Sequence, residues 1–199
     1  RLDMARGVPP EFTLRSDLSG LELELEPLGW RKAAGRTGTL EVAGQLGDAP
    51  RIDRLRLEAP GLEATGGRVT LTQEGQLERA SFERVQAGRW LDAPVQLVGR
   101  GPGAPPQVVL DGGTADLRYH TLNAAGGESG TSPEGSGSPV TLALDRLQIS
   151  ESIALTDMRA ELETGGGLDG TFSGRVNGGA RVAGRVVPRT GRNAFRKTL

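Results

Sequence analysis

The sequence contains no cysteine, a single histidine and very few aromatic residues: two Trp, one Tyr and four Phe. The lack of cysteine excludes a disulfide framework, a thiolate metal site and a cysteine nucleophile. One histidine, His120, excludes metal sites built from several histidines. No apolar run approaches the roughly 18–20 residues of a membrane-spanning helix, and the first residues lack the charged-then-apolar pattern of a signal peptide.

Glycine and proline are abundant instead, with 31 and 12 residues. Apolar residues make up 36% of the chain and charged residues 25%, with a formal net charge of −1, so the sequence can still build a core. We expect that core to be made of aliphatic faces rather than aromatic rings. Because the sequence begins with Arg1 rather than Met, we also expect it to be a segment of a longer protein.

Alternation of apolar and polar residues is the strongest pattern, as in the run Leu21–Glu26, which reads LELELE. Such a period of two places successive side chains on opposite faces of a β-strand. The same pattern recurs along most of the chain. No stretch of eleven residues follows the helical period, so the sequence predicts almost no helix.

Turn residues separate these runs every 8–14 residues or so, which predicts about thirteen strands in a curved antiparallel meander. Asn177-Gly178 supplies the positive φ angles of a tight hairpin turn, so Val176 and Ala180 should flank it. Residues 99–106 (GRGPGAPP) are too rich in Pro and Gly for a strand and predict a stiff loop. Residues 124–139 predict a flexible Gly/Ser-rich excursion, with sheet at 1–123 and its continuation at 140–199.

A long meander with one aliphatic face must cover that face. The sheet can fold onto itself as a closed sandwich or barrel, or form a solenoid. Alternatively it can remain an elongated open groove that holds something apolar. Glycines within the strands ease sharp bending, which favours the groove, but the pattern leaves both architectures open.

Several segments, taken in order, resemble AsmA-like proteins of the YhdP and TamB type. The first reads LGWRKAAG and is similar to a segment found in that family. The segments that carry the resemblance are 28–35, 38–44, 51–71, 80–85, 88–95, 153–157 and 174–178.

The resemblance implies a periplasmic protein that is anchored to the inner membrane by a segment outside this chain. It also implies a β-groove that conducts or shields phospholipids between the inner and outer membranes, with acyl chains on the apolar face. The expected partners are therefore phospholipid acyl chains and, through the full-length protein, both membranes. The residues expected to line the groove are Leu55, Leu57, Val69, Leu71, Val95, Leu97, Leu142, Leu144, Ile153 and Leu155.

The alternative function is a structural or binding module of a secreted or surface protein, built as a closed sandwich or solenoid. No phosphate loop, HExxH or Gly-x-Ser-x-Gly motif occurs, and His120 has no nucleophile motif, so we expect no enzyme, cofactor or metal. We interpret Asp111–Asp116 as a hairpin turn, and Trp30 and Trp90 as packing residues. The arginines of residues 170–199 are interpreted as a solvated face, with anionic headgroups as the alternative contact and no nucleic acid.

Overall fold

The computed structural model describes residues 2–3, 10–25, 28, 30–47, 50–120, 137–165 and 167–188. This part of the chain contains fifteen β-strands and no α-helix. None of its segments is a helix with the length and hydropathy that crossing a bilayer requires. The sequence prediction of an all-β chain is therefore confirmed for the described residues.

The strands have the short lengths usual in antiparallel sheets. Those of the first half are β1 (Leu2–Asp3), β2 (Glu11–Ser16), β3 (Leu23–Leu25), β4 (Trp30–Lys32), β5 (Thr39–Gln45), β6 (Arg51–Ala59), β7 (Leu62–Leu71) and β8 (Leu77–Ala87). Those of the second half are β9 (Leu91–Val98), β10 (Gln107–Asp111), β11 (Thr114–Asp116), β12 (Pro139–Gln148), β13 (Ala154–Glu163), β14 (Asp169–Val176) and β15 (Arg181–Val186).

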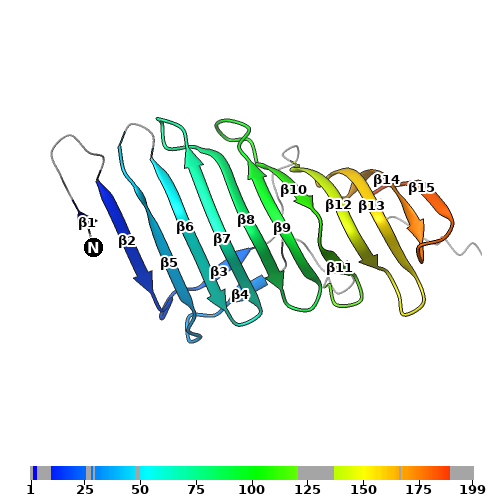
Figure 1. Cartoon of the computed structure of the whole chain (residues 1–199), viewed down its shortest axis with the longest axis horizontal. Coiled ribbons are helices and arrows are strands. Elements are labelled where there is room, and N and C mark those ends of the chain that lie inside the picture. The colour runs from blue at the N-terminus through cyan, green and yellow to red at the C-terminus, as the bar shows by residue number, and fades with distance from the viewer. Residues whose placement is uncertain are drawn as a thin grey trace, which may run out of the picture.

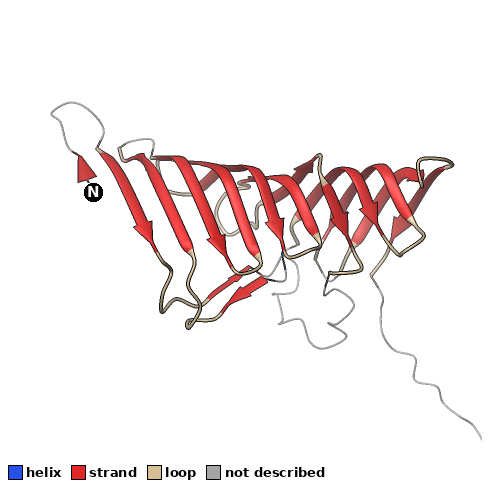
Figure 2. Ribbon diagram, turned by 60° about the horizontal axis from the view of Figure 1, so that its bottom comes forward, coloured by secondary structure: helices blue, strands red, loops and turns tan. Residues whose placement is uncertain are grey.

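Thirteen of these strands form one sheet, and β3 and β4 form a separate hairpin. The strands of the sheet lie side by side almost in sequence order, from β1 at one end to β15 at the other (Figure 1). The described strands form a single large sheet whose end strands, β1 and β15, are not paired with each other, so this sheet is not closed into a barrel. Figure 2 shows the strands of this sheet side by side along its length, with the hairpin beneath them.

The meander is antiparallel except at one place, where the prediction was wrong. Strand β12 runs parallel to both β10 and β11, with Leu110 opposite Leu142 and Ala115 opposite Leu147. The connection between β11 and β12 includes most of the predicted excursion, and residues 121–136 lie outside the described residues. A long connection is what allows the chain to re-enter a sheet in the same direction, because a tight hairpin always reverses it.

Strands β10 and β11 share one position in the sheet and are separated by Gly112-Gly113, with φ angles of 99° and 81°. The predicted hairpin turn at Asp111–Asp116 is therefore wrong, because the chain continues in the same direction. The amide of Gly113 donates to the Asp145 carboxylate at 2.9 Å, and the amide of Asp145 donates to the Gly113 carbonyl at 2.9 Å. Positive φ at both positions explains the glycines.

Other local predictions are confirmed. Residues 99–106 form the loop between β9 and β10. Asn177 and Gly178 both have positive φ, 48° and 75°, and the Val176 amide donates to the Ala180 carbonyl at 2.9 Å across the reversal.

Trp30 attaches the β3–β4 hairpin to a turn of the sheet, and Lys32 attaches it to the connection that precedes β3. The indole nitrogen of Trp30 donates to the Pro60 carbonyl at 2.9 Å, at the turn between β6 and β7. Lys32 is only 2% exposed, and its ammonium donates to the carbonyls of Leu18 and Leu21 at 2.7 and 2.8 Å. A buried ammonium needs such acceptors because its charge has left water.

Gly44 is buried at the point where the pairing register of β5 and β6 shifts. The two strands approach so closely there that only glycine fits. A Cβ added there would clash with the backbone carbonyl of Arg51 and come within 3.0 Å of the Ile52 Cα. We predict that Gly44→Ala lowers the free energy of unfolding by about 1–3 kcal/mol, because the backbone of β6 must shift. Urea titration of the purified chain measures it.

The matched control is Gly35→Ala, since a Cβ at Gly35 meets nothing within 4 Å. This variant should stay within about 0.5 kcal/mol of the wild type. Equal losses in both variants would contradict the assignment of a close approach at Gly44.

Candidate functional site

One face of the large sheet is apolar from end to end, and we call it the apolar face. Its first row of directly paired residues crosses eleven strands and contains only apolar residues and glycine. The row consists of Phe12, Gly44, Ile52, Val69, Ala80, Leu97, Val108, Val140, Leu162, Gly170 and Val186. Directly paired residues share a face, so no charged or polar side chain interrupts this row.

A second row runs beside the first and is equally apolar. This row has two parts, which meet at Gly67. Gly67 lies between Leu55 and Phe82, because a Cβ added at Gly67 would come within 2.8 Å of both side chains. The row consists of Leu14, Val42, Leu55 and Gly67, then Phe82, Val95, Leu110, Leu142, Ala160, Phe172 and Gly184.

A third row lies near the opposite rim of the sheet and consists of Ala59, Leu62, Ala87, Leu91, Ala115, Leu147, Leu155 and Val176. Its middle is well buried, with Ala87 1% and Leu91 3% exposed. Most large residues of the first two rows are only half-buried, among them Val69, Leu97 and Leu142. Within the described residues, no second large sheet or helix covers them.

The structure places nine of the ten predicted groove residues on this face. Leu71 ends β7 opposite Leu77, and Leu144 pairs with Met158. Leu55, Leu57, Val69, Val95, Leu97, Leu142 and Leu155 occupy paired positions in apolar rows. Ile153 instead lies in the turn before β13, where it is 43% exposed.

Simple alternation of apolar and polar residues along the sequence does not identify the apolar positions that follow a register shift. In β6 the apolar positions step from Ile52 to Leu55, and in β7 from Ala64 to Gly67, three residues instead of two. Each shift adds one residue, which returns the apolar side chains to the same face. An apolar spacing of three within a strand is the sequence signal that could have revealed them.

Charged side chains occupy the other face. Arg84 binds Asp92 through two hydrogen bonds of 2.7 and 2.5 Å, and Arg185 binds Asp169 at 3.0 Å. The Arg84 guanidinium lowers the pKa of the Asp92 carboxyl below its ordinary value. The arginines of β15 are exposed, as expected of a solvated face, and residues 189–199 of the predicted basic stretch lie outside the described residues.

The turns between β6 and β7 and between β8 and β9, together with the end of β11, form what we call the lower rim (Figure 1). The Gly88 amide donates to the Gly61 carbonyl at 2.8 Å, and the Asp116 amide donates to the Trp90 carbonyl at 2.6 Å. These bonds bring the three segments side by side.

Aromatic and cationic side chains cluster at the lower rim. The rings of Trp90 and His120 meet edge-on with centroids 4.1 Å apart. Arg89 lies over the Tyr119 ring at 3.9 Å and donates to its hydroxyl at 2.8 Å. Arg118 also approaches this ring and binds Asp116 at 2.9 and 2.6 Å, which lowers the pKa of the Asp116 carboxyl.

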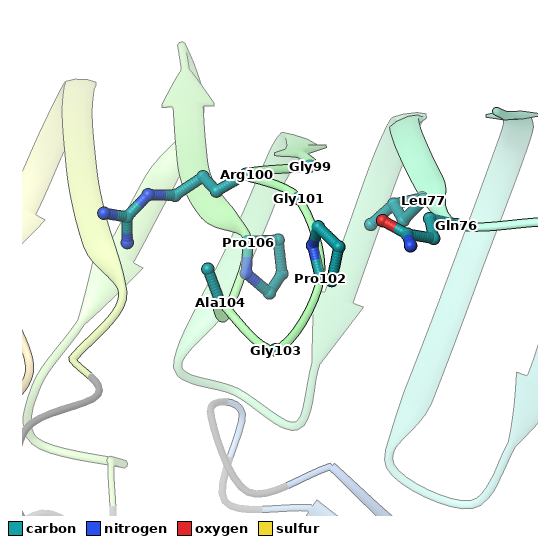
Figure 3. Close-up of a pocket in the computed structure, with 9 residues that line it drawn as sticks. All are labelled: Gln76, Leu77, Gly99, Arg100, Gly101, Pro102, Gly103, Ala104 and Pro106. Atoms are coloured by element: carbon teal, nitrogen blue, oxygen red, sulfur yellow. The ribbon is translucent and has the colours of Figure 1, made fainter. Parts of the chain in front are cut away.

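At the opposite rim, the loop between β9 and β10 encloses a shallow hollow of about 380 Å³ beside Gln76 and Leu77 (Figure 3). Pro102, Ala104 and Pro106 line it, and the Arg100 side chain extends away from it. The hollow holds no pair of groups suited to acid–base or nucleophilic chemistry. In the described part of the chain, no three His, Asp or Glu side chains lie close enough together to hold a metal ion.

No protein-family model matches this chain, and neither a curated protein nor a solved structure does. The features of this chain that bear on its function are therefore the apolar face and its rims.

The burial of His120 leads to a testable prediction about how the stability of the fold depends on pH. Burial lowers its pKa below the ordinary value of 6.5. The unfolded chain therefore binds a proton at a higher pH than the folded chain, so this group's contribution to stability is complete above 6.5 and is lost as pH falls towards the folded pKa. We predict that urea stability declines between pH 7.5 and 5.

His120→Gln should flatten this decline, because the chain has no other histidine. Carboxyl groups with lowered pKa values, such as those of Asp92 and Asp116, change the free energy of unfolding only at more acidic pH. An unchanged slope in the variant would contradict the assignment to His120.

Proposed function

We propose that this chain binds phospholipid acyl chains along its apolar face, as a segment of a larger AsmA-like protein that conducts phospholipids between the inner and outer membranes. The observation that carries the proposal is continuity. All eleven positions of the first row are apolar or glycine, and the second row runs beside it with the same composition.

The half-buried condition of this face supports the proposal. Val69, Leu97 and Leu142 are packed against their strand neighbours yet remain partly accessible, and no second large sheet faces them in the described part of the chain. Contact with an acyl chain would remove apolar surface of both partners from water, which is worth about 0.8 kcal/mol per buried CH₂ group. The sheet would then act as an open groove for the tails.

The size of the face fits a section of a conduit. Strands are spaced about 4.8 Å apart, so the eleven strands that the first row crosses extend the face by roughly 50 Å. The charged face would meet the aqueous periplasm, and membrane attachment would come from a segment outside this chain, as the AsmA-like resemblance implies. Transport along such a face needs no bond making or cofactor, so we propose no enzymatic activity.

Photocrosslinking from adjacent positions of β9 tests the proposal. Leu97 lies in the first apolar row, whereas Gln96 points to the charged face, where it accepts a hydrogen bond from Arg79 at 3.2 Å. With a diazirine residue at either position and vesicles of phosphatidylethanolamine and phosphatidylglycerol, we expect phospholipid adducts at position 97, because only that side chain contacts acyl chains. Mass spectrometry of the adducts measures the difference.

The variant with the crosslinker at position 96 is the matched control, since it shares strand, depth and local sequence. Equal labelling at the two positions would contradict a one-sided lipid track. So would the absence of lipid at position 97 together with its absence at positions 57 and 142.

A further inference from the structure

The aromatic residues of the sheet are sorted by polarity. Phe12, Phe82 and Phe172 lie in the rows of the apolar face. Trp90, Tyr119 and His120, whose rings carry polar atoms, gather at the lower rim. Rings with one apolar and one polar side are suited to a boundary between hydrocarbon and water, where Trp and Tyr are enriched in membrane proteins.

The cluster is continuous with the apolar face. Trp90 is half-buried and packs against the buried cluster that contains Leu91 and Ala115. Leu91 is the next residue along the chain and belongs to the third apolar row. The lower rim is therefore one of the two edges at which the apolar face meets polar groups, and it is the edge where aromatic and cationic side chains cluster.

Arg89 is the available cation of the cluster. Its hydrogen bond and its ring contact are both with Tyr119, an uncharged partner. Asp116 also attracts it, but this is the weakest of the interactions that lower the pKa of that carboxyl, and no salt bridge of Arg89 occurs among the described residues. Arg118, by contrast, is neutralised by its two hydrogen bonds to Asp116, and Glu151 attracts it more weakly. A guanidinium has five N–H donors, and only one of those of Arg89 is used by the Tyr119 hydroxyl, so several remain for an anionic oxygen.

We propose that Arg89, held by the ring and hydroxyl of Tyr119 beside Trp90, binds the phosphate of a phospholipid whose acyl chains lie on the apolar face. This inference rests on the proposed function and adds the headgroup site. Arg89 donates hydrogen bonds to the phosphate oxygens, the interaction for which a planar guanidinium is best suited. Tyr119 positions Arg89 by stacking under it and by accepting its hydrogen bond.

Competition between two lipids with the same acyl chains tests the headgroup site separately from tail binding. The purified chain is incubated with vesicles that contain dioleoyl phosphatidic acid and dioleoylglycerol in equal amounts, and the retained lipids are quantified by mass spectrometry. We expect the wild type to prefer phosphatidic acid by about tenfold, because this ratio corresponds to the free energy of one charge-assisted hydrogen bond. Arg89→Gln should bring the ratio near one without lowering total lipid.

Two further variants sharpen the test. Arg159→Gln removes the same charge from the other face, where Arg159 pairs with Ala143 and Ser173, and should keep the full preference. Tyr119→Phe keeps the ring but removes the hydroxyl, so the preference should fall by about threefold. All three sites are exposed, and unchanged thermal unfolding would show that the variants remain folded.

Each other outcome overturns a defined part of the proposal. Equal uptake of the two lipids by the wild type overturns the headgroup site and leaves tail binding standing. A preference that Arg159→Gln abolishes as strongly as Arg89→Gln overturns the assignment to Arg89. Uptake of neither lipid contradicts the proposed function itself. In that case, Arg89-dependent binding of glycerol 3-phosphate would assign the cluster to a soluble phosphate ester instead.

Discussion

This fold requires that apolar side chains pair directly between neighbouring strands. The large sheet has no second large layer in the described part of the chain, so each strand buries its apolar residues mainly against the strands beside it. Ala87 and Leu91 show the result, since they pair directly and are among the best-buried residues. Register shifts in β6, β7 and β8 follow from the same constraint, because an extra residue in one strand must be matched by its neighbours to keep the face apolar.

The two faces contribute unequally to stability. Exposed ion pairs such as Arg84–Asp92 and Arg185–Asp169 each stabilise a fold by about 0–1 kcal/mol. The apolar face must therefore supply most of the stabilisation, and it is also the surface proposed to hold lipid. Its third row is the best buried and its first two rows are more accessible, so one face can combine a stable core near the lower rim with an accessible surface above it.

Polar chemistry is confined to the rims. Glycines with positive φ occur in the turns, as at Gly61 and Gly88, and allow three segments to meet at the lower rim. There Trp90, His120, Arg89 and Tyr119 lie next to the buried cluster. Different parts of the sheet therefore have different roles. Alternation of residues along the strands creates the apolar face. The connections between the strands carry the groups that can select a headgroup.

The strands, the apolar face and tight turns such as Asn177-Gly178 could be predicted from the amino-acid sequence, because these features depend on side chains within a few residues of one another. The sequence pattern placed Leu55, Leu97 and Leu142 on one face correctly. The parallel pairing of β12 with β10 and the contact of Arg89 with Tyr119 became apparent only from the three-dimensional structure. Those features join residues about thirty positions apart, and local periodicity contains no information about which distant strand ends come together.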